Sequence, residues 1–325
     1  MGKLQLVLAI PENERSQALI DGTVQPAGID LTVIHKFDEV ADRHWGMLEG
    51  KFDAGEMSTS ALIQTRVTGK GEPQLALPVF FIRGLRYRNI IVNKASGMTN
   101  PAQLAGKKIG LTRNSATTII LVRGMLEEEF GVPMEDVHWV AAEPEHLPGK
   151  RKVKVEFLNK KRDAILEMLS AGELDAAVFP SNDDYYSIFG GGGLDKKIAK
   201  YGNLRSIMED PEDILEHYRR SGVHHIIHTI TVKESVLQEH PGVVPSLLQA
   251  FREARKLAFD YAATPERKRQ LEEEVRVLGR DPYDCRLGEE DIRSLEALMR
   301  YLVQQGFIEK QLPVRSLFAP GSLDS

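Results

Sequence analysis

A short phrase occurs twice in this chain and constrains its fold more than any other feature. The sequence Gly-Lys-Phe-Asp-Ala-Gly at residues 50–55 returns in kind as Gly-Glu-Leu-Asp-Ala-Ala at residues 172–177. Each copy follows a helix-like stretch and precedes a polar turn that contains serine. In an open α/β sheet, ligands bind beyond the carboxyl ends of the strands. Two such strand ends predict two α/β lobes that face one shared cleft, unless two helix–glycine–strand junctions resemble each other by chance.

Length, charge and cysteine content narrow the class of protein. A chain of 325 residues is long enough for two domains. Its formal net charge of -5 gives no basic field that would attract nucleic acid, so no nucleic-acid partner is expected. The single cysteine, Cys285, excludes an internal disulfide and fits a reducing compartment. Residues 4–10 are too short for a secretion signal, and no window approaches the roughly 18 apolar residues of a membrane span. We therefore expect a cytoplasmic protein with no membrane partner.

The order of the predicted elements indicates discontinuous lobes. Strand and helix patterns alternate through the first 92 residues and again through residues 93–224. Residues 225–232 alternate as a further strand, and the chain after them is helical. We expect lobe 1 to comprise residues 1–92 and 225–325, and lobe 2 residues 93–224. Two crossing strands would then join the lobes and form a hinge beside a ligand cleft.

Short segments along most of the chain are similar to one known family. They are residues 6–10, 21–22 with Pro26, 28–31, 52–58, 78–80, Arg83 with Arg86, 92–93, 106–110, Thr117, 123–124, 171–176, 226–228, Tyr301 and 305–306. On these segments the chain resembles the type II periplasmic-binding-protein fold, and more closely its cytoplasmic enzyme branch, the 4,5-dihydroxyphthalate decarboxylases. The resemblance implies cofactor-independent decarboxylation of a hydroxylated aromatic acid, phthalate-like or benzoate-like, in the cleft between the lobes.

That reaction places three demands on the protein. A ring hydroxyl donates electron density, an acid protonates the carbon that carries the carboxylate, and carbon dioxide leaves. No redox cofactor is needed, but the protein must hold carboxylates, supply a proton and exclude water. Arg83 and Arg86 suit the first demand, because guanidinium matches carboxylate in a bidentate fork. Placed just after a predicted strand, they would lie at the cleft rim, facing either ligand or solvent.

A second predicted carboxylate-binding element is the turn from Thr112 to Thr118, which opens a helix. Its free N–H groups, the hydroxyls of Ser115 and Thr117, and the positive charge of Arg113 favour an anionic ligand. Ordinary N-capping by serine or threonine is an equal alternative for this turn, and Arg113 is equally compatible with an exposed surface. The family pattern has an acidic or aromatic residue near positions 113–114, where this chain has Arg113 and Asn114. We include Asn114 among the substrate-binding candidates.

The turns that follow the two repeats supply further candidates. Glu56 comes directly after the first predicted strand, where partial desolvation would raise the pKa of its carboxyl group and suit it to donate or shuttle a proton. The alternative for Glu56 is to cap the helix that begins near Ser58. Ser58 and, after the second repeat, Ser181 are candidates for substrate binding.

Three histidines, His224, His225 and His228, lie close together in the sequence. In a strand, the first and third share one face and the second points away, so the three cannot converge on one ion. No carboxylate companion is evident, and we expect no metal. His228 is the preferred general acid or phenolate donor, with an interior structural histidine as its alternative. His225 is a candidate for an additional substrate contact.

These features leave three hypotheses in order of preference. The first is the cofactor-independent decarboxylase, with a small aromatic carboxylate as its substrate. The second is a solute-binding protein of the transporter type, which would use the same cleft without chemistry. The third is another lyase or dehydratase on the same scaffold. Apolar residues of the last helical segment also predict a subunit interface and hence a homo-oligomer; they are Leu295, Leu298, Leu302 and Phe307.

Overall fold

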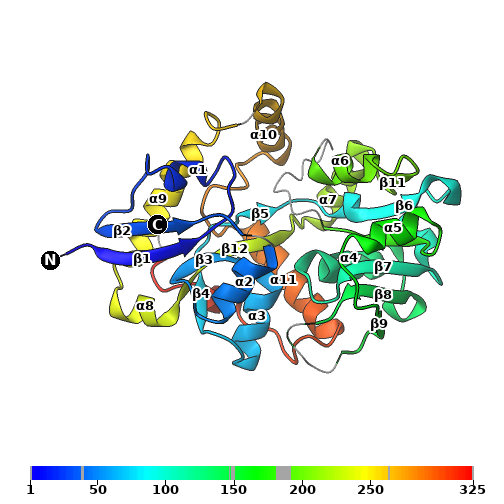
Figure 1. Cartoon of the computed structure of the whole chain (residues 1–325), viewed down its shortest axis with the longest axis horizontal. Coiled ribbons are helices and arrows are strands. Elements are labelled where there is room, and N and C mark those ends of the chain that lie inside the picture. The colour runs from blue at the N-terminus through cyan, green and yellow to red at the C-terminus, as the bar shows by residue number, and fades with distance from the viewer. Residues whose placement is uncertain are drawn as a thin grey trace. The chain divides into compact units, whose positions relative to one another are not determined.

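The computed structural model describes residues 2–37, 40–145, 147, 151–180, 192–262 and 264–323, apart from the side chains at positions 40 and 41. It confirms a mixed α/β fold with two separate sheets (Figure 1). The chain divides into two compact units. Unit 1 comprises residues 1–83, 226–292 and 312–325, and unit 2 comprises residues 84–225 and 293–311. No helix in the described ranges has the length and apolar character needed to cross a membrane.

Unit 1 is built on a sheet in the order β2-β1-β3-β12-β4, with β5 also paired to β12. The strands β1 and β2, and β1 and β3, run parallel, whereas β12 runs antiparallel to its three partners. Its elements are β1 (Leu4–Ala9), α1 (Gln17–Ile20), β2 (Ile29–Ile34), α2 (Val40–Leu48), β3 (Ala54–Ser58), α3 (Thr59–Thr68), β4 (Gln74–Ala76), β5 (Ile82–Arg83), β12 (Ile226–Lys233), α8 (Glu234–Glu239), α9 (Val243–Leu257) and α10 (Pro265–Leu278), with a 3-10 turn, η5 (Val314–Leu317).

Unit 2 carries the second sheet, in the order β11-β6-β10-β7-β8-β9. Its inner strands are parallel, except that β6 runs antiparallel to β10 and β11. Its elements are η1 (Tyr87–Asn89), β6 (Ile90–Asn93), η2 (Lys94–Ser96), η3 (Pro101–Leu104), β7 (Lys108–Arg113), α4 (Thr117–Phe130), η4 (Met134–Asp136), β8 (His138–Glu143), β9 (Val155–Phe157), α5 (Ala164–Ser170), β10 (Ala176–Val178), α6 (Gly193–Ala199), β11 (Leu204–Ser206) and α7 (Pro211–Ser221). Helix α11 (Glu289–Gln304) begins in unit 1 and continues into unit 2.

The repeated phrase has the same structural role in both units. The amide of Asp53 donates to the carbonyl oxygen of Val7 (3.0 Å), and its carboxylate accepts from the amide of Val7 (2.9 Å). Asp175 forms the same two hydrogen bonds with Lys108, at 2.9 and 2.8 Å. Each aspartate thus fastens the strand that follows it, β3 or β10, to the neighbouring parallel strand, β1 or β7. The resemblance between the two phrases is therefore structural and not a coincidence.

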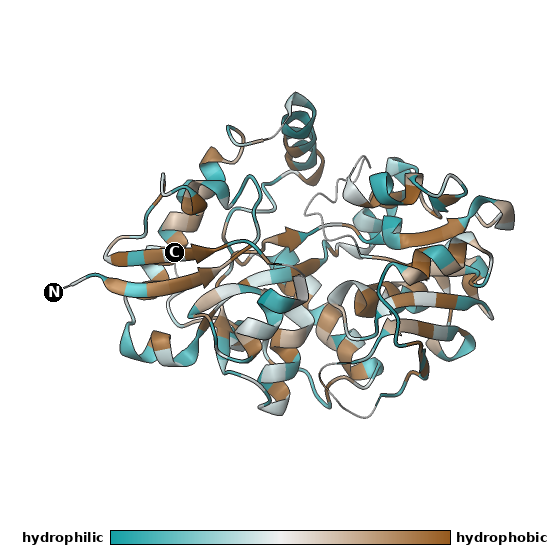
Figure 2. Cartoon of the chain, in the orientation of Figure 1, coloured by the Kyte–Doolittle hydropathy of each residue, from teal (hydrophilic) through white to brown (hydrophobic). Residues whose placement is uncertain are grey.

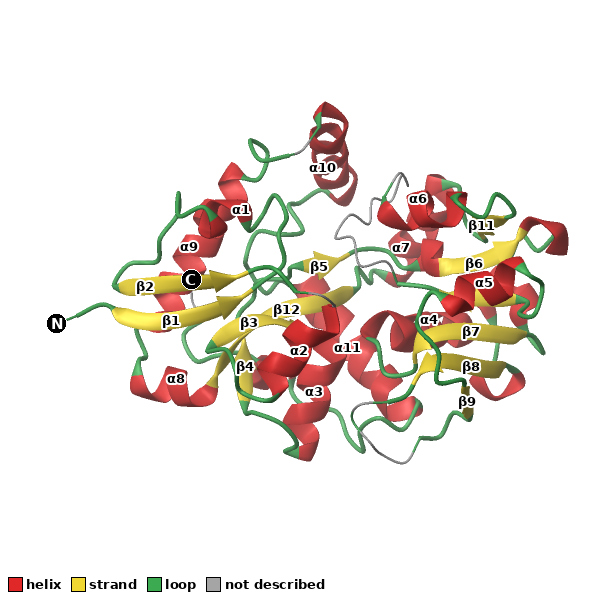
Figure 3. Ribbon diagram, in the orientation of Figure 1, coloured by secondary structure: helices red, strands yellow, loops and turns green. Residues whose placement is uncertain are grey.

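Each unit has its own apolar core. In unit 1, the strands and the helices α1 and α9 share one cluster of buried residues, which includes Leu8, Leu19, Ile230 and Phe251. In unit 2, the inner strands pack against α5 and α6. Figure 3 shows the strands of each sheet flanked by helices, and Figure 2 shows that these strands are predominantly hydrophobic. Helix α10 is mostly hydrophilic in Figure 2, with three buried residues, Arg267, Leu271 and Glu274.

Several boundaries differ from those that the sequence predicts. Strand β6 pairs with β10 and β11, so unit 2 begins at Gly84, ahead of the predicted boundary at residue 92. Residues 293–311 belong to unit 2, although the prediction assigned the whole segment 225–325 to lobe 1. Between β4 and β5 lies Pro78, which has no N–H to donate to a ladder.

The residues predicted to form a subunit interface are buried within the chain. Leu295, Leu298 and Leu302 of α11 are at most 1% exposed, and Phe307 is 4% exposed. Their apolar side chains therefore form part of the fold's own core. They do not supply the exposed face on which the expectation of an oligomer was based.

Candidate active site

Glu56 and His228 meet because of the register between β3 and β12. The strand predicted to end at Gly55 instead runs from Ala54 to Ser58, so Glu56 lies within β3 and not in a turn after it. In the antiparallel ladder, Glu56 is paired with Ile230, and His228 is paired with Ser58. Residues two apart on a strand share a face, so Glu56 and His228 are diagonal neighbours on the same side of the sheet.

Helix α2 brings two more side chains to this place. Two glycines allow α2 to approach closely: a Cβ on Gly46 would lie 2.2 Å from the ring of Phe52, and a Cβ on Gly55 would lie 2.7 Å from the sulfur of Met47. With α2 held this close to β3, Arg43 and His44 reach the carboxylate of Glu56. We call these four residues, Arg43, His44, Glu56 and His228, the Glu56 cluster.

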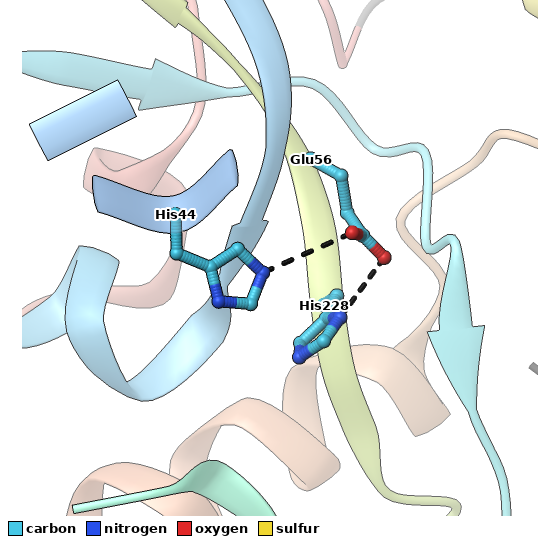
Figure 4. A group of neighbouring side chains, drawn as sticks. All are labelled: His44, Glu56 and His228. Atoms are coloured by element: carbon cyan, nitrogen blue, oxygen red, sulfur yellow. Dashed lines mark hydrogen bonds and ion pairs between the residues drawn. The ribbon is translucent and has the colours of Figure 1, made fainter. Parts of the chain in front are cut away.

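The carboxylate of Glu56 is the centre of the cluster. His228 Nδ1 lies 2.9 Å from Glu56 Oε1, and His44 Nε2 lies 3.8 Å from Glu56 Oε2 (Figure 4). Arg43 forms an ion pair with Oε2. The two imidazole rings meet edge to face with their centres 4.6 Å apart. The Glu56 side chain is fully buried, whereas His44 and His228 are 15% and 13% exposed, so the two rings form the accessible side of the cluster.

Charge pairing fixes the protonation of Glu56. Burial by itself would raise the pKa of this carboxyl group, but Arg43 and His228 together hold the pKa well below its ordinary value. Glu56 is therefore a carboxylate and can only accept hydrogen bonds, which means that Nδ1 of His228 carries the proton between them. Burial lowers the pKa of His44 to about 3, so His44 is a neutral imidazole at physiological pH.

This arrangement is suited to proton transfer. A carboxylate that accepts from Nδ1 fixes the tautomer and orientation of an imidazole and stabilises its protonated form, and Nε2 is then the atom that exchanges protons with a substrate. His44, Glu56 and His228 are also of the residue types that bind transition metals. The expectation that His228 lacks a carboxylate companion is wrong, because Glu56 is that companion.

The other two histidines of the sequence cluster lie elsewhere. His224 and His225 are buried at 0% and 1% exposure and belong to unit 2. The His224 amide donates to the Ser294 hydroxyl at 3.1 Å, and the His225 carbonyl accepts from Gly84 at 2.9 Å. His225 stays a predicted substrate contact, but its buried position is also that of a structural residue.

The two predicted carboxylate-binding arginines are not at an exposed rim. Arg83 is 2% exposed, and its guanidinium donates to Asp291 at 2.7 Å and to the carbonyl oxygen of Pro282 at 3.0 Å. Its positive charge is thus neutralised inside unit 1. Arg86 is fully buried in unit 2, just before η1. Neither side chain faces solvent, and their binding of a substrate carboxylate stays a prediction.

The turn before α4 is predicted to bind a carboxylate, and its residues can be placed in the structure. Helix α4 has Ala116 as its N-cap, so the N-cap position itself holds no serine or threonine. Thr117 is the first helical residue and is buried, and Ser115 lies in the turn. Arg113 forms an ion pair with Glu143 at 2.5 Å. Asn114 is buried, and its amide donates to Glu145.

Two serines are the remaining residues predicted to bind substrate, and two members of the Glu56 cluster were not predicted from the sequence. Ser58 ends β3, and its hydroxyl lies 3.2 Å from that of Ser60. Ser181 lies outside the described residues. Arg43 and His44 were not predicted, because a basic residue on a polar helix carries no signal of its own in a sequence. The one available hint was Gly46, which precedes the repeated phrase and allows the helix to approach the strand.

Comparison with known proteins shows which family the chain belongs to. No protein-family model matches the chain. A 4,5-dihydroxyphthalate decarboxylase from Pseudomonas putida is 31% identical over 191 residues, which cover 55% of this chain and 72% of that protein. The enzyme of the same name from Comamonas testosteroni is 29% identical over 345 aligned positions, covering 100% of this chain and 99% of that enzyme. The chain belongs to the 4,5-dihydroxyphthalate decarboxylase family. As a member of this family it is a carboxy-lyase.

Solved structures place this family member in a wider fold group. A putative periplasmic sulfonate-binding protein, SsuA, from Methylobacillus flagellatus matches it with a TM-score of 0.63 and 14% identity, covering 99% of this chain and 93% of that one. The alkanesulfonate-binding protein SsuA from Xanthomonas axonopodis pv. citri matches with a TM-score of 0.59 and 14% identity, covering 98% and 99%. The predicted type II periplasmic-binding-protein-like fold is thereby confirmed. At such low identity the likeness establishes the fold and not the function.

Proposed function

We propose that this protein decarboxylates a hydroxylated aromatic acid, phthalate-like or benzoate-like, without a cofactor, and that His228 supplies the proton. Family membership supports the reaction class. The observation that carries the assignment of His228 is its hydrogen bond of 2.9 Å to the buried carboxylate of Glu56. A partly exposed imidazole whose inner nitrogen is held by a carboxylate is a suitable proton donor.

The reaction requires one proton to enter and one carbon dioxide molecule to leave. A hydroxyl group on the ring supplies electron density to the carbon that carries the carboxylate. Protonated His228 transfers its Nε2 proton to that carbon, which interrupts the aromaticity of the ring. The carbon–carbon bond then breaks, its electron pair returns to the ring, and carbon dioxide departs. Solvent returns a proton to His228, so the sum is one carboxylate and one proton giving the decarboxylated ring and carbon dioxide.

The rest of the Glu56 cluster prepares His228 for this step. Glu56 accepts from Nδ1, which fixes the orientation of the ring and directs Nε2 away from the carboxylate. Arg43 keeps Glu56 deprotonated, so that the carboxylate does not take up the proton intended for the substrate. Neutral His44 packs edge to face against His228 and limits the rotation of its ring. We retain the turn at Arg113, Asn114, Ser115 and Thr117 as a predicted anion-binding element of unit 2, because the first N–H groups of α4 lie there.

The test is carbon dioxide release by purified, EDTA-treated protein from a panel of hydroxylated benzoates and phthalates. In the variant His228→Ala, we expect kcat to fall by about 10²–10⁴-fold, because a positioned general acid contributes about that much. The matched control is His138→Ala, which removes an exposed histidine that also faces a carboxylate, Glu156, at 3.1 Å. Equal turnover by wild type and His228→Ala would refute the role of His228.

The second hypothesis from the sequence, a binding protein without chemistry, is disfavoured by membership of a decarboxylase family. It predicts that aromatic carboxylates raise the melting temperature while no carbon dioxide is released from any of them. That pair of results would replace the proposed decarboxylase with a solute-binding function.

A further inference from the structure

The side chains proposed to manage the proton also form a set of metal ligands. The donor atoms of His44, Glu56 and His228 all lie within 4.8 Å of one another (Figure 4). Two imidazoles and one carboxylate are a donor set that Zn²⁺ and neighbouring divalent transition metals prefer. We infer that these three residues bind a divalent transition-metal ion such as Zn²⁺ and that the bound ion inhibits decarboxylation. The binding follows from the geometry alone, whereas the inhibition rests on the function proposed above.

The three donor atoms of the cluster are near enough for side-chain movements to bring them onto one ion. Ligand atoms about 2.1 Å from zinc at tetrahedral angles lie about 3.4 Å from one another. His228 Nδ1 lies 2.9 Å from Glu56 Oε1, and His44 Nε2 lies 3.8 Å from the other oxygen, Oε2; one donor atom from each of the three residues lies within 4.8 Å of the other two. Side-chain movements of up to about 1.4 Å would bring the three donor atoms from these separations to tetrahedral ones. Both rings are partly exposed to solvent, whereas the His44 Nε2 atom itself is buried.

Arg43 determines what kind of metal site this is. Its guanidinium is paired with Oε2 of Glu56, which leaves Oε1 for a metal ion. A positive side chain in contact with the ligating carboxylate repels a divalent cation and lowers its affinity. The cluster therefore has the ligands of a zinc site without the charge balance of a permanent one. We therefore expect the metal ion to bind reversibly and to be removed by EDTA, unlike a permanently bound metal.

Metal binding and proton donation exclude each other at His228. The ion takes the lone pair of Nδ1, so the ring's single proton must move to Nε2. The metal-bound ring has no free lone pair with which to accept the second proton that would make it an acid. Glu56 also exchanges its hydrogen bond with His228 for a bond to the metal. The occupied site thus lacks the imidazolium that the reaction needs.

Isothermal titration of EDTA-treated full-length protein with Zn²⁺ tests the binding. We expect one saturable site per chain in the wild type, at least a tenfold loss of affinity in His44→Phe, and wild-type affinity in the control His138→Phe. A titration with Co²⁺ gives a second measurement that needs no variant, because Co²⁺ bound to two imidazoles and a carboxylate acquires intense visible absorption bands. Absence of saturable binding in the wild type, or equal affinity in His44→Phe, would overturn the site.

The inhibition is tested separately, so that its failure differs from failure of the proposed function. In turnover assays, Zn²⁺ should abolish carbon dioxide release with a half-saturation equal to that in the calorimeter, and EDTA should restore the rate. Metal binding with an unchanged or increased rate at saturation would refute the inhibition. If no substrate is turned over, the proposed function fails, while the titrations still decide whether the metal site exists.

Discussion

The buried ion pair between Arg43 and Glu56 gives the most quantitative prediction from this structure. The Glu56 side chain is fully buried, and that of Arg43 is 4% exposed. Replacing Glu56→Gln keeps the size of the side chain but leaves the guanidinium of Arg43 buried without a countercharge. Breaking a buried pair in this way costs about 3–5 kcal/mol of unfolding free energy. For a domain of 150–250 residues, each kcal/mol corresponds to about 2–4 °C, so we expect the melting temperature to fall by about 6–20 °C.

A double-mutant cycle separates the pair from other effects. Arg43→Met removes the countercharge of Glu56 but leaves the hydrogen bond from His228, so we expect a loss at the lower end of that range, about 3 kcal/mol. In the double variant neither charge is left unpaired. Its loss should be smaller than the sum of the single losses by about 2–3 kcal/mol, which is near the upper end of coupling energies for contacting residues.

Urea unfolding followed by tryptophan fluorescence is the appropriate assay. Trp45 lies in α2 beside Arg43 and His44 and reports on unit 1, whereas Trp139 in β8 reports on unit 2. The midpoints and slopes of the four transitions give the four free energies. Additivity within about 0.5 kcal/mol would show that the two charges do not depend on each other. That result would refute both the pairing and the argument that Arg43 keeps Glu56 ionised.

Two further predictions address the support of the cluster and the pH dependence of the fold. Gly55→Ala would place a Cβ 2.7 Å from a backbone oxygen of β1 and 2.7 Å from a methionine sulfur of α2. We therefore expect the unfolding free energy to fall by about 1–3 kcal/mol and kcat to decrease. The control is Gly242→Ala, because nothing lies within 4 Å of a Cβ at that position. Burial raises the pKa of Glu274 to about 7, against the opposing charge of Arg267 and three further arginines. Between about pH 4.5 and 7 the native state therefore binds more protons than the unfolded state, and the unfolding free energy falls as pH rises, by up to about 3 kcal/mol. Melting curves at pH 5 and 8 should show this fall in the wild type and a smaller one in Glu274→Gln; parallel curves would contradict the prediction.

The sequence determined the features that depend on neighbours along the chain. The repeated phrase predicted two α/β halves, and the structure explains it through Asp53 and Asp175, which fasten corresponding strands by the same pair of hydrogen bonds. Alternating apolar residues located the strand that contains His228, because the period of two is a local property of extended backbone. The chemical types of Glu56 and His228 also made them candidates before their positions were known.

Only the tertiary structure decided which of these residues act together. Whether Glu56 faces His228 depends on the register between β3 and β12, which are separated by about half of the chain. Arg43 and His44 join them because α2 packs against β3, a contact that no local pattern encodes. Arg83 has the chemistry of a ligand-binding residue, yet it is paired with Asp291, which is distant in the sequence. A side chain's charge is fixed by the sequence, but its partner is fixed by long-range packing, and the partner determines whether that charge serves the fold or the chemistry.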